Sequence, residues 1–191
     1  MDDAPIECEV KFFPIDMQEI RKKLKTADAV LKTPERLMRR RVFSYEKNPG
    51  MKCTYVRVRD EGNKITMSAK QRASGGDIES QKEYETIVSD FESACNILLN
   101  AGLVQTGYQE NRRETWQMPD GTLVELETWP GLPNYLEIEG GSVTVLKEVA
   151  ALLQLDWSKH IVKANDYLYG LHYGIERDAV YKKLEHLTFD E

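Results

Sequence analysis

The chain has 191 residues, of which 41% are hydrophobic and 30% charged, a balance that suits one folded domain and excludes a disordered tail. Its 32 acids and 26 bases leave a net charge of −6, which argues against duplex nucleic acid as the main partner. No apolar run approaches the roughly 18 residues of a membrane span. The acidic start MDDAPIE lacks a hydrophobic targeting core, so we expect a cytoplasmic protein.

In chain order, alternation of apolar and polar residues predicts strands through the first half of the sequence. A helix is expected after Pro14, with Asp16 in its first turn and Ile15, Ile20 and Leu24 on its apolar face. Asn48-Pro49-Gly50 reads as a turn, and Glu61-Gly62-Asn63 as a hairpin connection. The expected strands cover residues 6–13, 36–46, 53–60, 64–72 and 78–88.

The second half continues with a helix over 89–100, for which Ser89 is the candidate N-cap. Strands are expected over 108–117, 122–128 and 134–139, and helices over 142–154, 163–173 and 176–187. We therefore predict a single α+β domain over residues 1–191, with an antiparallel barrel or strongly curved sheet within about 5–140 and C-terminal helices over about 142–188.

The cysteines and histidines offer no metal site of their own. Cys8, Cys53 and Cys95 are far apart and odd in number, which predicts neither a disulfide framework nor a zinc motif. The three histidines also lack ligand spacing. A metal ion would therefore be held by oxygen ligands.

Charged side chains recur on one face of strand after strand. Glu7, Glu9 and Lys11 alternate with apolar residues, as do Arg57 and Arg59. An antiparallel sheet with one solvated face gives the same alternation. Four Glu-x-Glu pairs, however, place like charges side by side, which solvated sheets avoid. If the sheet closes, this face becomes a charged lumen and the apolar face lies under the helices.

Such a lumen fits one class of ligand, a polyphosphate with its divalent metal. Lysine and arginine neutralise phosphate oxygens. Paired glutamates supply the hard oxygen ligands that Mg²⁺ or Mn²⁺ prefers. A non-catalytic polyphosphate-binding module would need the bases but not so many acids, because carboxylates without metal repel the ligand.

The charged motifs resemble, in order, those of the CYTH superfamily, the triphosphate tunnel metalloenzymes. Glu7-x-Glu9-x-Lys11 is similar to the ExExK signature of that family, and Glu137-Ile-Glu139-Gly140 to its closing EIEG strand. The motifs between them are Tyr55-Val-Arg57-Val-Arg59, Thr66-Met-Ser68-Ala-Lys70, Glu83-Tyr-Glu85 and Arg112-Arg113-Glu114-Thr-Trp116. The resemblance covers roughly residues 5–155.

This resemblance implies a closed eight-stranded antiparallel tunnel with helices packed outside, a triphosphate substrate, and Mg²⁺ or Mn²⁺. It also implies roles for individual residues. The implied metal ligands are Glu7, Glu9, Glu83, Glu85, Glu125, Glu127, Glu137 and Glu139. The implied phosphate-binding residues are Lys11, Arg57, Arg59, Lys70, Arg72 and Arg113, with one base from Arg39, Arg40 and Arg41, of which we favour Arg41. The expected catalytic residues are Glu7, Glu9, Lys11 and Glu85.

The leading hypothesis is a metal-dependent triphosphatase, and the absence of a nucleophile triad and of a P-loop fits a tunnel mechanism. The same site acting on ATP would make a class IV adenylyl cyclase, and thiamine triphosphate is a further substrate option. The expected partner is a small-molecule triphosphate rather than nucleic acid or a membrane, with a homodimer left open. We expect the stripe of Tyr167, Tyr169 and Tyr173 to pack in the core rather than stack on a nucleotide.

Overall fold

The computed structural model describes residues 6–44, 55–72, 81–176, 179–180 and 184–189, except the side chains of residues 6–7, 71–72 and 81–82. The predicted turn at 48–50 lies outside these residues. The strands are β1 (Ile6–Phe12), β2 (Val30–Ser44), β3 (Tyr55–Asp60), β4 (Ile65–Arg72), β5 (Gln81–Val88), β6 (Val104–Gln117), β7 (Leu123–Thr128), β8 (Tyr135–Gly140) and β9 (His186–Leu187). The helices are α1 (Met17–Thr26), α2 (Phe91–Asn100), α3 (Val143–Leu152) and α4 (Asn165–Tyr173), with a 3₁₀ turn at Trp157–Lys159.

Three helices begin at a side chain that accepts hydrogen bonds from the first-turn amides. Ser142 caps α3, as its position before the apolar repeat suggests. Asp16 caps α1 rather than lying within its first turn, because its carboxylate accepts from the amides of residues 18 and 19. The prediction for α2 was wrong by one residue, since Asp90 and not Ser89 is its cap.

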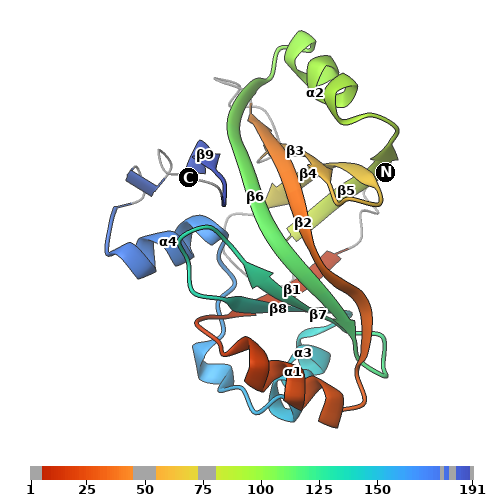
Figure 1. Cartoon of the computed structure of the whole chain (residues 1–191), viewed down its shortest axis with the longest axis vertical. Coiled ribbons are helices and arrows are strands. Elements are labelled where there is room, and N and C mark those ends of the chain that lie inside the picture. The colour runs from red at the N-terminus through yellow and green to blue at the C-terminus, as the bar shows by residue number, and fades with distance from the viewer. Residues whose placement is uncertain (1–5, 45–54, 73–80, 177–178, 181–183, 190–191) are drawn as a thin grey trace.

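The strands form one antiparallel curled sheet, which gives the chain its α+β class (Figure 1). The spatial order is β2-β3-β4-β5-β1-β8-β7-β6-β9, and β2 pairs with β6 as well as with β3. β2 and β6 are the two longest strands and run side by side along the molecule. The short β9 adds to β6 in parallel.

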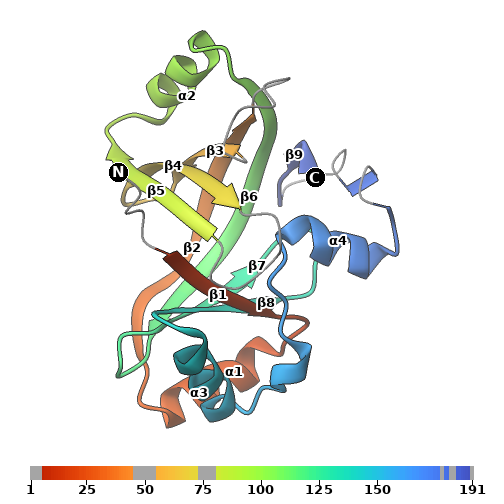
Figure 2. The same cartoon turned by 180° about the vertical axis from the view of Figure 1, so that it is seen from behind.

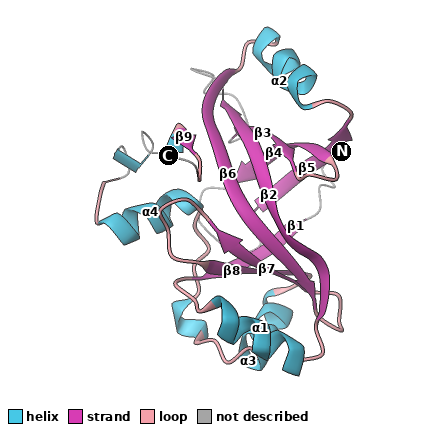
Figure 3. Cartoon of the chain, viewed as in Figure 1, coloured by secondary structure: helices cyan, strands magenta, loops and turns pink. Residues whose placement is uncertain are grey.

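The apolar core lies on the convex side of the curl. α1 and α3 gather at one end of the sheet and α2 at the other (Figure 3). Buried residues of α1 and α3, among them Leu24 and Leu146, pack on Val10, Leu126 and Ile138 from the strands. A separate cluster under α2 contains Phe43, Val58 and Cys95. The concave side is therefore left to the charged side chains, as the sequence pattern predicts.

The C-terminal segment departs from the expected arrangement of helices outside the sheet. Ile161 pairs with Lys11 of β1, and the chain then continues beside β1 into α4 (Figure 2). Leu168 and Tyr169 of α4 pack with Trp129 and Tyr135 at the end of the concave face. Of the predicted tyrosine stripe, Tyr169 is buried, whereas Tyr167 and Tyr173 are partly exposed.

Two further bounds differ from the sequence analysis. β2 begins at Val30 and not at 36, because residues 30–33 pair with the far end of β6, and the register shifts around Pro34, which has no amide hydrogen to donate. The helix predicted over 176–187 does not reach its expected end, since His186 and Leu187 form β9. Within the described residues, no helix is long and apolar enough to cross a membrane.

Candidate active site

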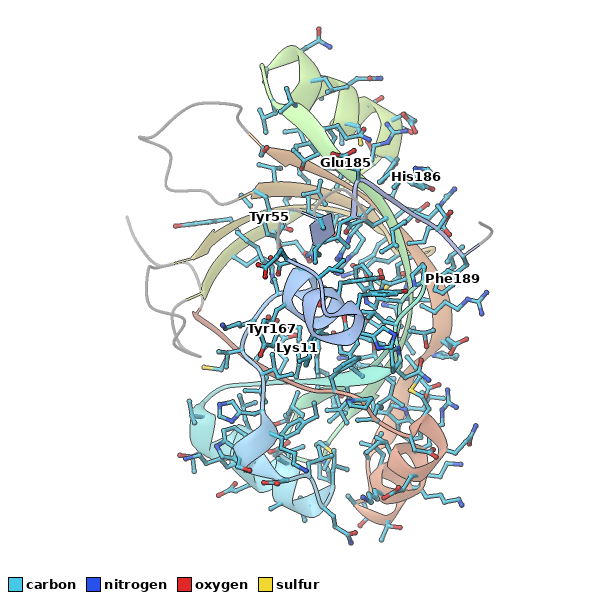
Figure 4. The ribbon with its side chains drawn as sticks, turned by 90° about the vertical axis from the view of Figure 1, so that its left-hand side faces the viewer. Lys11, Tyr55, Tyr167, Glu185, His186 and Phe189 are labelled. Carbon is cyan, nitrogen blue, oxygen red and sulfur yellow. The ribbon has the colours of Figure 1, made fainter. Side chains whose placement is uncertain are left out.

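A cavity of about 1640 Å³ occupies the concave side of the sheet. Figure 4 views this space from the α4 side, with α4 across the front and the labelled Lys11 and Tyr55 on opposite sides. The charges on its lining are divided between two walls. An acidic wall comes from β1, β7 and β8, and a basic wall from β2, β3 and β4. β5 and β6 lie between the two walls in the strand order.

The acidic wall centres on Glu125, Glu127 and Glu137. One carboxylate oxygen from each lies within 4.8 Å of the others, and all three side chains are largely buried. Glu125 and Glu137 are direct register partners on β7 and β8, which fixes their proximity. Arg113 of β6 forms ion pairs with all three carboxylates.

Glu127 is the most enclosed of these carboxylates, with no exposed surface. Besides Arg113, it accepts hydrogen bonds from Asn111 Nδ2 and Trp129 Nε1, both at 2.9 Å. Burial raises the pKa of Glu127, and Glu137 and Glu125 add to the rise, against the opposing effect of Arg113.

Lys11 lies where β1 meets this acidic wall and is 3% exposed. Its Nζ is 3.0 Å from Glu137 Oε1 and 3.2 Å from Glu9 Oε1. Burial alone would lower the pKa of Lys11, but Glu137 and Glu9 outweigh burial and raise it above the ordinary lysine value. The two carboxylates thus favour the charged ammonium form of Lys11. Glu139 lines the cavity and is the register partner of Glu9.

The donor set of the acidic wall fits a divalent cation. Glu9, Glu125, Glu127 and Glu137 share two cations, Lys11 and Arg113, so carboxylates outnumber the bases that pair with them. Clustered carboxylate oxygens are what Mg²⁺ and Mn²⁺ prefer. Three of the predicted oxygen ligands, Glu125, Glu127 and Glu137, thus lie close enough together to hold one cation.

The basic wall centres on Arg57 of β3 and Lys70 of β4. Arg57 Nη2 and Lys70 Nζ both lie 3.0 Å from a carboxylate oxygen of Glu83 on β5. Burial raises the pKa of Glu83, but Arg57 and Lys70 outweigh burial, and the carboxyl pKa is lowered overall. Glu85 is 4.0 Å from Arg57 and its side chain is 35% exposed, so it faces the open cavity.

The basic wall also includes two arginines of β2: Arg36, which sequence reasoning missed, and Arg40, which it named as a candidate but did not favour. Arg40 is the register partner of Arg59, lines the cavity and lies 4.3 Å from the centroid of the Trp129 ring. Its Nε donates to Gln109 Oε1 at 3.0 Å. Burial lowers the pKa of Arg40 to about 10, and Arg57 adds to this effect, so positive charge is crowded here.

The preference for Arg41 has to be corrected to Arg40. Arg41 faces the convex side, where it forms an ion pair with Glu92 and lies over the Phe91 ring. Its register partner is Val58, a core residue of that side. The sequence could have indicated this, because Phe43, two residues after Arg41, shares its strand face and is apolar.

The remaining predicted residues divide by whether the structure describes them. The side chains of Glu7 and Arg72 lie outside the described residues, although both residues belong to strands. Arg59 is buried and pairs with Glu61 at 2.7 Å, a carboxylate that sequence reasoning did not single out. The structure thus brings together, around one cavity, Glu9, Lys11, Arg57, Arg59, Lys70, Glu83, Glu85, Arg113, Glu125, Glu127, Glu137 and Glu139.

The structure is therefore a curled antiparallel sheet with acids and bases facing one cavity. The family model of the CYTH domain matches residues 5–164, and the chain belongs to this family. Members of the family are generally metal-dependent, in keeping with the acidic cluster. No curated protein matches the chain.

Several solved structures share the fold. The chain is similar to the PH1012 protein of Pyrococcus horikoshii (23% identity, TM-score 0.71), with 85% of this chain and 99% of that one covered. It is also similar to a putative adenylate cyclase of Vibrio parahaemolyticus (12%, TM-score 0.69, 88% and 99% covered). A third is the putative adenylyl cyclase HpAC1 of Hippeastrum, described as having a dominant triphosphatase activity (13%, TM-score 0.59, 97% and 99% covered).

Proposed function

We propose that this protein is a divalent-metal-dependent triphosphatase whose substrate lies between the acidic and basic walls of the cavity. The observation that carries the proposal is the separation of charge. Bases that bind phosphate face carboxylates that bind metal across one space, and neither set alone would suit a triphosphate–metal unit. Membership of the CYTH family and the activity of the Hippeastrum protein support it.

The basic wall supplies the groups that bind the phosphates. Arg57 and Lys70 are held by Glu83, which fixes both cations before substrate arrives. Arg57 Nε is buried without a hydrogen-bond partner among the described residues, and it can donate to a phosphate oxygen. Arg59 extends the row, and Lys11 and Arg113 neutralise charge from the opposite wall. This preorganisation orients the terminal phosphate for attack by water.

The acidic wall supplies the metal ligands. Glu125, Glu127 and Glu137 would hold Mg²⁺ or Mn²⁺, and Glu9 and Glu139 lie next to them on β1 and β8. A bound divalent cation neutralises phosphate oxygens and stabilises charge that develops during phosphoryl transfer. Glu85, the most exposed of the carboxylates paired with the basic wall, is our candidate for orienting the attacking water.

The strand pairing supports a closed tunnel as the form of this site. β2 pairs with β3 along one side and with β6 along the other, and β1 pairs with both β5 and β8. A closed tunnel excludes water from the phosphates and strengthens their interaction with the bases. It also accounts for like charges on neighbouring strands, which an open solvated sheet would avoid.

The test is to incubate the purified protein with tripolyphosphate, ATP and thiamine triphosphate, each with Mg²⁺ or Mn²⁺, and to separate phosphate, pyrophosphate and cyclic AMP. We expect phosphate from tripolyphosphate, only with metal. Cyclic AMP and pyrophosphate as the main products from ATP would replace the triphosphatase with an adenylyl cyclase. Metal-dependent binding of all three without turnover would leave a polyphosphate-binding module.

A further inference from the structure

The end of the cavity beside the β3–β4 turn carries two bases, Arg36 and Lys64, that the proposed triphosphate site does not use. Arg36 of β2 and Lys64 after the turn join Arg59 around one buried carboxylate, Glu61. The three nitrogen–oxygen distances are 3.2 Å for Arg36, 3.8 Å for Lys64 and 2.7 Å for Arg59. Three cations around one anion leave positive charge in excess. We refer to Arg36, Arg59, Glu61 and Lys64 as the turn-end cluster.

Arg36 has unused donors inside this cluster. Its Nη2 donates to Glu61, but its Nε and Nη1 are buried and have no hydrogen-bond partner within the part of the chain that the structure describes. Buried donors of a charged group are rarely left unpaired, because the lost hydration is not replaced. Arg36 lines the cavity, so an acceptor that enters from the cavity can reach it.

The position of Arg36 also connects the cluster to the site already described. Arg36 and Arg113 are register partners on β2 and β6, two like charges directly opposite each other. Arg113 is balanced by its three carboxylates, whereas Arg36 shares Glu61 with two other cations. Burial lowers the pKa of Arg59, with further lowering by Arg57 and Arg113, which indicates the same surplus of positive charge.

The chemistry of this end favours an anion over a nucleobase. Lys32, Thr33 and Asn63, all polar, line the cavity beside the cluster. The aromatic residues Trp129 and Tyr135 are buried against α4, and Arg40 already lies 4.3 Å from the centroid of the Trp129 ring. A ligand that continues from the phosphate site toward the turn is therefore met by cations and polar groups.

We propose that the turn-end cluster binds an additional phosphate of a condensed phosphate chain longer than tripolyphosphate. The proposal rests on the proposed function, because the first phosphates of the chain would lie on Arg57 and Lys70. Arg59 belongs to both sites, being two residues from Arg57 on the same strand face and paired with Glu61. The phosphate oxygens would accept from Arg36 Nε and Nη1.

The test compares the affinities of tripolyphosphate and tetrapolyphosphate by titration calorimetry in metal-free buffer, in which the proposed hydrolysis does not consume them. We expect tetrapolyphosphate to bind wild type about tenfold more tightly, the scale of one charge-assisted hydrogen bond. Arg36→Gln should remove most of this preference. Arg39→Gln is the matched control, since Arg39 is on the same strand but pairs with Asp60 on the exposed face, and it should retain the preference.

Each outcome separates this inference from the proposed function. If neither phosphate binds, the proposed function fails. If tripolyphosphate binds but tetrapolyphosphate binds no more tightly, the turn-end proposal fails alone, and the same holds if Arg36→Gln weakens both ligands equally. Lys64→Gln tests the cluster at a side chain that is 41% exposed, so its loss leaves the core intact. This variant should reduce the preference for tetrapolyphosphate. An unchanged preference in both Arg36→Gln and Lys64→Gln would overturn the proposal.

Discussion

Substitution of Arg57 by glutamine tests the basic wall most directly. Arg57 Nη2 binds Glu83 at 3.0 Å, and its Nε is buried and unpartnered among the residues that the structure describes. Lys70 lies at the same distance from the other oxygen of Glu83, so the carboxylate keeps a cation when Arg57 is lost. The variant is therefore expected to fold, whereas removal of one member of an isolated buried ion pair costs about 3–5 kcal/mol.

The expected loss of ligand affinity is larger than the loss of stability. A hydrogen bond to a charged group contributes about 1.5–3 kcal/mol. Its loss should therefore raise the dissociation constant roughly 10- to 100-fold. We expect this change for tripolyphosphate in metal-free buffer, in which it is not turned over, measured by titration calorimetry. Thermal unfolding without ligand should show a destabilisation of about 1–2 kcal/mol, because one buried hydrogen bond is lost.

Arg41→Gln is the control, since it removes the same charge from the neighbouring strand. Arg41 faces the convex side and pairs with Glu92, whose side chain is 62% exposed. Exposed pairs contribute about 0–1 kcal/mol, so stability and tripolyphosphate affinity should both stay close to wild type. Equal binding by wild type and Arg57→Gln, or equal loss in the two variants, would refute the assignment of the cavity face to Arg57.

Three further predictions concern the metal site, the core and a helix cap. Glu125→Gln should weaken Mn²⁺ binding at least about tenfold by calorimetry, because a carboxylate ligand is lost. The control Glu148→Gln, on the exposed face of α3, should leave Mn²⁺ binding unchanged. Equal Mn²⁺ affinity in the two variants would contradict the acidic cluster as the metal site. Leu146→Ala should destabilise the fold by about 2–5 kcal/mol in urea unfolding, since this side chain is fully buried between α3 and the sheet; a change under about 1 kcal/mol would contradict that packing. Amide hydrogen bonds from residues 19 and 18 hold the pKa of Asp16 below its usual value, so its stabilising effect is present above about pH 4 and lost as pH falls below that. Asp16→Asn should flatten this acid limb of the unfolding profile, and identical limbs would count against the cap.

Much of the site could be predicted because strand alternation is a local property. Glu9 and Lys11 face the cavity as the period of two requires, and Glu125 and Glu137 meet because their strands are adjacent. The sequence also contains the information that places Arg41 outside. Three successive arginines do not show by themselves which of them faces the cavity, however. Phe43, two residues after Arg41, and Val58, its partner on β3, are core residues and place Arg41 on the convex side.

Other features depend on distant contacts and leave no local pattern. Residues 30–35 show no alternation of apolar and polar residues and contain a proline, yet residues 30–33 extend β2 because they pair with β6. His186 and Leu187 form a strand for the same reason, against β6. The choice of Asp90 over Ser89 as a cap lies within the usual one- or two-residue uncertainty of a helix end. Tertiary pairing decides the two strands, whereas the cap is a local contact with the amide of residue 93.

Helix α4 has a consequence for where the folded unit around the cavity ends. Tyr169 donates to the carbonyl of Pro130, and Tyr173 to that of Gly131, so α4 fastens the loop that follows Trp129. Trp129 in turn donates to Glu127 in the acidic cluster. The family match stops at residue 164, but the mechanical support of a metal-ligand candidate continues past it. A chain that ended at residue 164 would keep every charged motif. It would lose the α4 hydrogen bonds to the loop after Trp129, the residue that donates to Glu127.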